Sequence, residues 1–252
     1  MKALRTGLAI LTVWLSGAAH ADELNIAVAA NFLGTLQKLA PAFEKSSGHT
    51  LVLSGGSSGQ FYQQIVQGAP FDIFLSADSE RPRKLEEQGL AVAGSRFTYA
   101  VGKLVLWSPQ PQVVDDRGEV LKRGDYRFIA VANPVNAPYG AAAREVLEQL
   151  DLWEKLTAGK KIVTGESIGQ TLQFITSGNA RLGFVALAQV IDDSGRIRGS
   201  VWPVPQDLYQ RIDQDAVVLQ RSQKRAAATA FLQWLRNDEQ ALRIIAAAGY
   251  GH

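Results

Sequence analysis

The sequence contains no cysteine, one methionine and only three histidines among 252 residues. Without cysteine the chain cannot form a disulfide, carry a lipid on a cysteine, or use a thiolate for metal binding or redox chemistry. The histidines are His20, His49 and His252, so few imidazoles are available for acid–base catalysis. The fold must be stabilised by its hydrophobic core, which a composition of 46% apolar and 20% charged residues permits.

The sequence also lacks a surplus of charge once its N-terminus is set aside. Residues 1–21 have a basic start, an apolar stretch and a small-x-small site ending at Ala21, which is typical of a cleavable export signal. The apolar stretch is shorter than the ~20 residues that span a bilayer, which disfavours the alternative of a membrane anchor. Removing Lys2 and Arg5 from the 26 basic residues leaves 24, equal to the 24 acidic residues. We therefore expect an exported protein that does not bind nucleic acid.

Strand-like apolar runs alternate with helical patterns along the chain, which predicts an α/β fold with mostly parallel strands. The predicted strands are residues 24–29, 50–54, 71–75, 104–107, 128–131, 162–163, 182–185 and 215–219. The predicted helices are residues 33–47, 60–67, 78–88, 141–150, 168–176, 223–236 and 239–247. Pro41 is expected to kink or divide the first helix, because proline removes a helical hydrogen bond.

The two series of strands and helices predict two lobes, each a mixed, mostly parallel sheet flanked by helices. Residues 22–102 and 215–252 are assigned to the first lobe, and residues 103–214 to the second. Strands near Val101 and Val217 are expected to connect the lobes as a hinge. A single large sheet is the alternative.

One turn matches a catalytic motif. Residues 55–59, Gly-Gly-Ser-Ser-Gly, follow the G-x-S-x-G pattern of the hydrolase nucleophile between a strand and a helix. A hydrolase of this type needs a histidine after the serine, but His49 precedes Ser57 and His252 ends the chain. The same turn offers backbone N–H groups and hydroxyls at a helix N-terminus, which favours an anion. Simple helix capping by Ser57 or Ser58 also explains it.

Three further turns lie where a predicted strand leads into a helix. They are Ala30-Asn31-Phe32, Ala137-Pro138-Tyr139-Gly140 and Gly165-Glu166-Ser167-Ile168. The carboxyl ends of parallel strands form the edge at which open α/β sheets bind ligands, so four openings predict a shared site for a small anion. None contains lysine or arginine, and neutral donors suit a fully deprotonated oxyanion.

Other polar residues give weaker signals. A hydrogen phosphate would need an acceptor for its own hydrogen, and Glu166 is the carboxylate near these turns. The acidic residues Asp192, Asp193, Asp213 and Asp215 are interpreted as turn residues rather than as a metal site. Tyr139 is expected either to contact the ligand or to pack.

Several segments together resemble a known family. They are Ala-Ala-Asn-Phe (29–32), Gly-Ser-Ser-Gly-Gln (56–60), Gln-Gly-Ala-Pro-Phe-Asp-Ile-Phe-Leu-Ser-Ala-Asp (67–78), Ala-Asn-Pro (132–134), Ala-Pro-Tyr-Gly (137–140) and Leu-Gly-Phe-Val-Ala (182–186). In this order they resemble the periplasmic molybdate-binding proteins of ABC importers.

The resemblance implies a two-lobed periplasmic binding protein of the class II type that closes on molybdate or tungstate in the cleft between its lobes. It implies a periplasmic protein without a cofactor or enzymatic activity that delivers the anion to an inner-membrane ABC permease, and we expect a monomer. Sulfate and phosphate remain alternative ligands. An iron(III)-binding protein would need clustered tyrosines and a carboxylate.

The resemblance also assigns residues to the ligand. The main ligand-binding positions are Asn31, Ser58, Tyr139 and Ile168, and the adjacent Ala30, Ser57 and Ser167 are secondary candidates. No residue is expected to ligate the metal atom directly. Some members carry a donor tyrosine where this chain has Ala186, so the site here has either one donor fewer or Tyr139 as a substitute.

Overall fold

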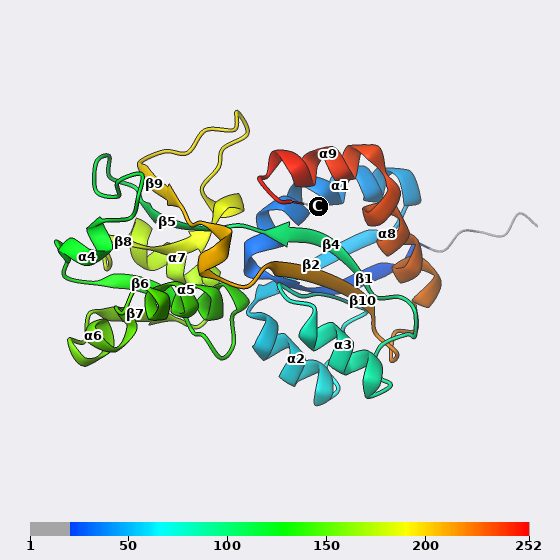
Figure 1. Ribbon diagram of the computed structural model, residues 1–252. Helices are drawn as coiled ribbons and strands as arrows, with labels where there is room; N and C mark the ends of the chain where they lie inside the picture. The colour runs from blue at the N-terminus through cyan, green and yellow to red at the C-terminus, as the bar shows by residue number, and fades with distance from the viewer. Residues whose placement is uncertain (1–20, 252) are drawn as a thin grey trace, which may run out of the picture.

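The computed structural model describes residues 21–251, which form two five-stranded sheets in two lobes (Figure 1). Apart from Ala21, the predicted export signal lies outside the described residues, as does His252. The strand order is β2-β1-β3-β10-β4 in the first sheet and β7-β6-β8-β5-β9 in the second. The predicted two-lobed α/β architecture is confirmed, and the alternative of a single sheet is wrong.

The first lobe contains both ends of the described chain (Figure 1). Its strands are β1 (Glu23–Ala29), β2 (Thr50–Gly56), β3 (Ile73–Leu75), β4 (Phe97–Gly102) and β10 (Ile212–Val218). Its helices are α1 (Ala30–Ser47), α2 (Ser58–Val66), α3 (Glu80–Glu87), α8 (Arg225–Asn237) and α9 (Glu239–Ala247). Strands β1, β2 and β3 are parallel, and β10 runs antiparallel to β3 and β4.

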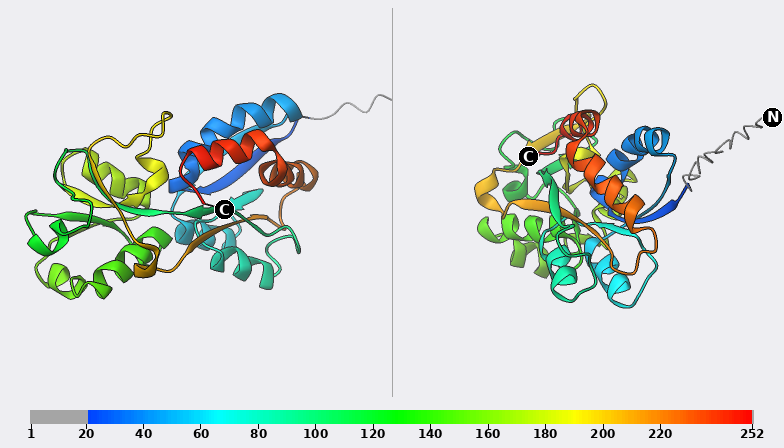
Figure 2. Two further views of the ribbon diagram at one scale, coloured as in Figure 1. Left: turned by 45° about the horizontal axis from the view of Figure 1, so that its top comes forward. Right: turned by 90° about the vertical axis from the view of Figure 1, so that its right-hand side faces the viewer.

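The first sheet is buried on both faces. Helices α1, α8 and α9 cover one face, and α2 and α3 cover the other (Figure 2). Within β1, Ile26 and Val28 pack into the core on the α1 side, whereas Ala27 packs into the core on the α2 side. Burial of both faces explains why β1 is a continuous apolar run rather than an alternating one.

The second lobe repeats this plan between the two crossings of the chain. Its strands are β5 (Leu104–Ser108), β6 (Ile129–Ala132), β7 (Ile162–Gly165), β8 (Leu182–Ala186) and β9 (Ser200–Pro203). Its helices are α4 (Val120–Arg123), α5 (Pro138–Gln149), α6 (Trp153–Ala158), α7 (Ile168–Thr176) and the 3-10 turns η1 (Leu187–Gln189) and η2 (Gln206–Leu208). Strand β6 is parallel to β7 and β8, while β5 is antiparallel to β8 and β9.

Some local predictions differ from the structure. Helix α1 is not divided at Pro41, because its buried face, which includes Leu39 and Phe43, packs on the first sheet over the whole length of the helix. Asp213 lies within β10 rather than in a turn, since the strand begins three residues before the predicted start, and Asp215, also interpreted as a turn residue, lies in the same strand. The strand expected near Val101 is β4, whereas strand β9 and helices α4 and α6 were not predicted.

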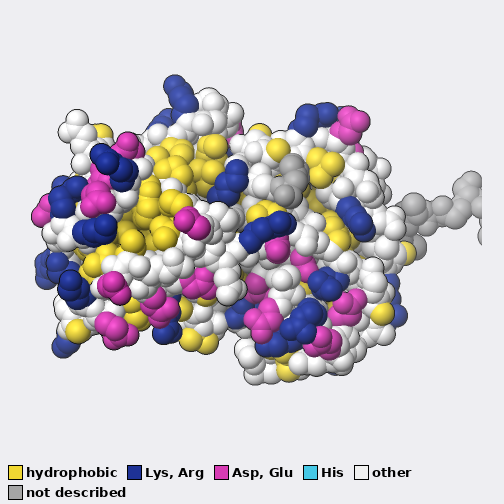
Figure 3. All heavy atoms as spheres, in the orientation of Figure 1, with side chains coloured by type: hydrophobic (Ala, Val, Ile, Leu, Met, Phe, Trp, Pro, Cys, Tyr) yellow, Lys and Arg dark blue, Asp and Glu magenta, His cyan; other side chains and the backbone are white. Residues whose placement is uncertain are grey.

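Charges of both signs are interspersed on the molecular face in Figure 3, with no broad area of one sign. This distribution agrees with the balanced charge of the chain after its first 21 residues. Within residues 21–251, no helix has the length and apolar character needed to cross a membrane.

Candidate functional site

Two pairs of helix N-termini lie at the carboxyl ends of adjacent parallel strands. In the first lobe, Ala29 at the end of β1 is paired with Gly56 at the end of β2; helix α1 begins directly after Ala29, and α2 begins after one intervening residue, Ser57. In the second lobe, Ala132 of β6 is paired with Gly165 of β7, and helices α5 and α7 follow. Each lobe therefore presents two neighbouring helix N-termini at one edge of its sheet.

The four main residues assigned from the sequence occupy the first two positions of these helices. Ser58 and Ile168 are the first residues of α2 and α7, whereas Asn31 and Tyr139 are the second residues of α1 and α5. Amide groups at these positions have no acceptor within their own helix. All four residues are at most 4% exposed. Buried N-terminal amides of this kind require a partner from outside the helix.

The residues before these helices leave the relevant amides uncapped. Helices α1 and α5 follow Ala29 and Ala137, which have no side-chain acceptor. Helices α2 and α7 follow Ser57 and Ser167, whose hydroxyls accept only from the third amide of each helix, at 3.4 Å and 3.2 Å. Ser57 and Ser167 are thus helix caps, which for Ser57 agrees with the capping interpretation made from the sequence.

Ser58 has a different role from Ser57. Its hydroxyl oxygen accepts from the amide of Ala77 at 2.8 Å, which ties the start of α2 to the end of β3. Because a serine hydroxyl is also a donor, its hydrogen remains available to a ligand.

The two lobes meet at these helix N-termini. The amide of Gly59 in α2 donates to the carbonyl oxygen of Asn136, just before α5, at 2.8 Å. The starts of α1 and α7 also meet, since a Cβ atom on Gly169 would lie 3.3 Å from the Cβ atom of Ala30. The structure therefore brings the opening of α1 to that of α7, and the opening of α2 to that of α5.

A buried polar network connects Asn31 and Tyr139. The side-chain amide of Asn31 donates to Gln214 Oε1 at 2.8 Å and to the hydroxyl of Tyr250 at 3.1 Å. Gln214 Nε2 in turn donates to the hydroxyl of Tyr139 at 3.2 Å, and the hydroxyl of Tyr99 lies 3.1 Å from Gln214 Oε1. Burial raises the pKa of Tyr99, Tyr139 and Tyr250, so that all three phenols stay protonated at neutral pH.

Sequence reasoning missed Gln214, although one signal was present. In the run Ile-Asp-Gln-Asp-Ala, Gln214 alternates with Ile212 and Ala216, the pattern of one face of a strand. The predicted strand begins at residue 215, after Gln214, whereas β10 begins at Ile212.

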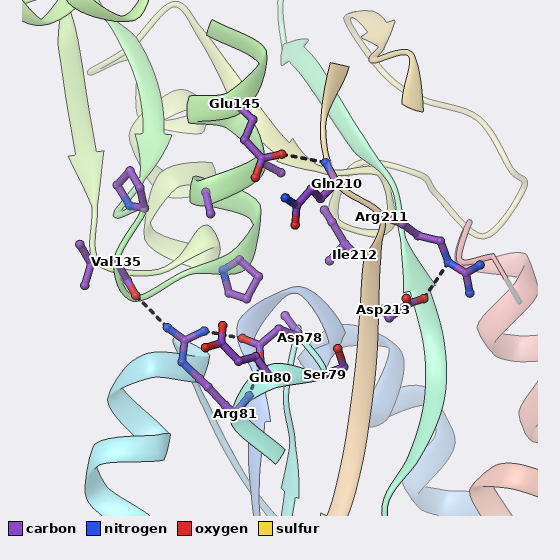
Figure 4. Close-up of a pocket in the computed structure, with 15 residues that line it drawn as sticks. Asp78, Ser79, Glu80, Arg81, Val135, Glu145, Gln210, Arg211, Ile212 and Asp213 are labelled. Carbon is purple, nitrogen blue, oxygen red and sulfur yellow. Dashed lines mark hydrogen bonds and ion pairs between the residues drawn. The ribbon is translucent and has the colours of Figure 1, made fainter. Parts of the chain in front are cut away.

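A cavity of about 350 Å³ lies between α3, α5 with the turn before it, and the start of β10 (Figure 4), and Pro138 is the one residue of the four openings that lines it. Arg81 from the first lobe donates to the carbonyl oxygen of Val135 in the second at 2.7 Å and forms an ion pair with Asp78. On the other side of the molecule, Lys38 of α1 pairs with Asp193 of the second lobe. These contacts connect the lobes outside the helix N-termini.

The structure argues against catalysis by Ser57. Within the described part of the chain His49 is the single imidazole, and its Nδ1 accepts from the amide of Asp22 at 3.0 Å. His49 and Ser57 flank the two ends of the extended strand β2, which places them roughly 25 Å apart. No proton transfer from Ser57 to His49 can occur over this distance.

Neither Glu166 nor Ala186 supplies a side-chain hydrogen-bond donor to the site. Glu166 is exposed and its carboxylate accepts from Asn133 and Asn136 at 3.4 Å. Ala186 is completely buried in the core of the second lobe, in the same cluster as Tyr139 and Ile168. A methyl side chain supplies no hydrogen-bond donor.

Comparisons with known proteins agree with this architecture. The family model of bacterial extracellular solute-binding proteins matches residues 24–251. The molybdate-binding protein ModA of Azotobacter vinelandii is 51% identical over 94% of this chain and 93% of its own length, and that of Rhodobacter capsulatus is 52% identical over 99% and 96%. The solved structure of the periplasmic molybdate-binding protein of Azotobacter vinelandii is 49% identical, with a TM-score of 0.89 over 91% of this chain and 99% of that one.

These relatives are named as molybdate-binding proteins rather than as enzymes, which confirms the prediction that the chain is not an enzyme. From the match to the family model and the identities above 50%, the chain belongs to the bacterial extracellular solute-binding proteins and, within them, to the family of the molybdate-binding proteins ModA.

Proposed function

We propose that this protein binds molybdate in the periplasm and delivers it to an ABC permease of the inner membrane, and that it also binds tungstate. The observation that carries the proposal is the set of buried, uncapped amides at the first or second positions of four helices, two from each lobe. The names of the relatives support the choice of molybdate.

The donor set suits a dianion. We propose that the amides of Asn31, Ser58, Tyr139 and Ile168 and the hydroxyls of Ser58 and Tyr139 donate to the four oxygens, with Ala30 contributing its backbone at the same helix start. About seven hydrogen bonds at roughly 1.5 kcal/mol each give on the order of 10 kcal/mol, which corresponds to tens of nanomolar. Helix dipoles add partial positive charge at the same place.

Closure of the two lobes around the anion is the step that precedes its delivery to the permease. We propose that residues 22–102 with 215–252 and residues 103–214 form two bodies, that the boundary at 214/215 falls within the crossing strand β10, and that the bodies move about the crossings near β4 and β10. One lobe captures the anion, and the other closes on it through the contacts of Gly59 and Arg81. A monomer in the closed form would then dock on the permease.

Calorimetric titration of the chain from Asp22 onward with molybdate, tungstate, sulfate and phosphate tests the proposal. We expect saturable binding of molybdate and tungstate at nanomolar concentrations, and sulfate at least about 100-fold weaker, because the smaller sulfate cannot reach all fixed donors at once. Tight binding of sulfate or phosphate without binding of molybdate would contradict it.

A further inference from the structure

Gln214 is completely buried in β10 at an irregularity of the sheet. The register between β10 and β4 shifts between Gln214 and Asp215, and the side chains of both residues are buried. The extra residue is Tyr99 of β4, which lies between the partners of Gln214 and Asp215, and bulges are frequent beside binding sites. The carboxylate of Asp215 accepts from Arg96 and Thr98 of the first lobe, both at 2.7 Å.

The side chain of Gln214 instead contacts a residue of each lobe. Its Oε1 atom accepts from Asn31 Nδ2 at 2.8 Å, and its Nε2 atom donates to the hydroxyl of Tyr139 at 3.2 Å. Asn31 belongs to α1 in the first lobe, and Tyr139 belongs to α5 in the second. One carboxamide therefore connects the two helix N-termini directly.

Gly102 provides the space for this connection. A Cβ atom at Gly102, the last residue of β4, would lie 2.2 Å from the hydroxyl oxygen of Tyr139 and 2.7 Å from Gln214 Nε2. Any side chain at this position would separate Gln214 from Tyr139. The glycine at the crossing between the lobes thus serves this contact.

We infer that Gln214 is a positioning residue of the anion site, which holds Asn31 and Tyr139 across the lobes and keeps the hydroxyl hydrogen of Tyr139 free for the ligand. This inference rests on the proposed function. Gln214 acts through Asn31 and Tyr139 and donates nothing to the anion itself.

The reason lies in the hydrogen bonds of Tyr139. Its hydroxyl oxygen accepts from Gln214 Nε2, so its own hydrogen points elsewhere, and none of the described residues accepts it. A buried hydroxyl hydrogen without an acceptor is costly, and an oxygen of a bound anion removes that cost. If the amide of Gln214 were reversed, Oε1 would accept the hydrogen of Tyr139 and the site would lose a donor.

Asn31 fixes the orientation of the Gln214 amide. Asn31 Nδ2 donates to Gln214 Oε1 and to Tyr250, which occupies both of its hydrogens, and its Oδ1 atom is buried without a partner among the described residues. The side chain of Asn31 therefore serves Gln214 and Tyr250, while its backbone amide, at the second position of α1, is free for the anion.

A double-mutant cycle tests this coupling. Tyr139→Phe, Gln214→Leu and the double variant are titrated with molybdate by calorimetry, with Gln220→Leu as a matched control because Gln220 is exposed beyond the end of β10. We expect each single variant to bind molybdate roughly 10- to 100-fold more weakly than wild type. In the Gln214→Leu background, we expect Tyr139→Phe to weaken molybdate binding by less than about threefold. If the loss of affinity in the double variant equals the product of the losses in the two single variants, the inference is overturned.

Gln214→Glu separates positioning from a purely structural role. The ionised carboxylate would accept the hydrogen of Tyr139 and repel the dianion, whereas the neutral acid has nearly the shape of glutamine. Burial raises the pKa of a glutamate at this position, so we expect affinity relative to wild type to recover at least about tenfold between about pH 9.5 and pH 5. The charged and titratable groups around this position are Tyr99, Tyr139, Tyr250, Asp78 and Asp215, and wild type measured over the same pH series accounts for them.

A ratio of Gln214→Glu to wild-type affinity that does not change with pH would overturn the inference. Thermal unfolding of each variant without ligand shows whether it is folded at the temperature of titration. Absence of molybdate binding by the wild-type protein would overturn the proposed function, and the inference with it. Wild-type binding combined with unaltered affinity in the Gln214 variants would overturn the inference alone.

Discussion

The amide of Gly59 in the first lobe donates to the carbonyl oxygen of Asn136 in the second over 2.8 Å. A Cβ atom on Gly59 would lie 2.8 Å from the Cα atom of Asn136, which is closer than side chains approach backbone. The contact therefore depends on glycine, and it joins the N-terminus of α2 to the turn before α5. The lobes can close to this distance only because residue 59 has no side chain.

Gly59→Ala is expected to weaken molybdate binding by about tenfold or more, since the added methyl group holds the lobes apart. Calorimetric titration measures the change. Gly34→Ala is the control, because no atom lies within 4 Å of a Cβ atom at that position in α1. It should bind as wild type and unfold at an equal or higher temperature, since alanine favours a helix over glycine. Equal affinity in Gly59→Ala and wild type would contradict the role of this contact.

Arg81 connects α3 to the carbonyl oxygen of Val135 across the lobes. Arg81→Ala is expected to release molybdate about three- to tenfold faster, because the closed form loses one charge-assisted hydrogen bond. Stopped-flow displacement of bound molybdate by excess tungstate measures the release rate. Arg83→Ala on the same helix removes only an exposed pair with Glu87 and should leave the rate unchanged. The same acceleration in both variants would argue against the connection.

Tyr139→Phe is expected to lower molybdate affinity by roughly 10- to 100-fold, because it removes one hydroxyl that donates to a charged ligand. In wild type the affinity should stay constant from about pH 7 to pH 9, since burial raises the pKa of Tyr139 and keeps it protonated. Calorimetry at several pH values checks both expectations. A wild-type affinity that fell over this range would indicate a titrating group in the site.

Alkaline pH should destabilise the fold through its buried tyrosines. Burial raises the pKa of Tyr99, Tyr139 and Tyr250 in the folded state. As the pH rises, the unfolded chain therefore loses these phenolic protons before the folded protein does. The contribution of the three tyrosines to the free energy of unfolding is complete below about pH 10. Above that pH it declines by about 1.4 kcal/mol per pH unit for each tyrosine. Urea unfolding at rising pH should show a shallower decline for Tyr250→Phe than for wild type. Parallel declines would contradict this account.

The sequence allowed the elements around the site to be predicted well, because their signals are local. Apolar runs marked β1 and β8, and helix α7 was predicted over the same residues that form it, Ile168–Thr176. The position of Ser58, Asn31, Tyr139 and Ile168 at helix N-termini also follows from local patterns of strand, turn and helix.

The parts that could not be predicted depend on contacts between distant residues. Asn31 and Gln214 are 183 residues apart, and nothing in either local sequence indicates their hydrogen bond. The irregularity beside Gln214 arises where β10 pairs with β4, at the extra residue Tyr99, which no local sequence pattern marks. Likewise, the roles of Gly59 and Gly102 appear only when the opposite lobe is in place.

The central claim is that an oxyanion is held by neutral donors from four helix N-termini. Crystals grown with molybdate, with diffraction data collected at the molybdenum absorption edge, locate the metal atom directly by its anomalous signal. We predict one peak between the lobes, with ligand oxygens within hydrogen-bonding distance of the amides of Asn31, Ser58, Tyr139 and Ile168 and no lysine or arginine in contact. A peak elsewhere, or an anion bound by a basic side chain, would contradict the claim.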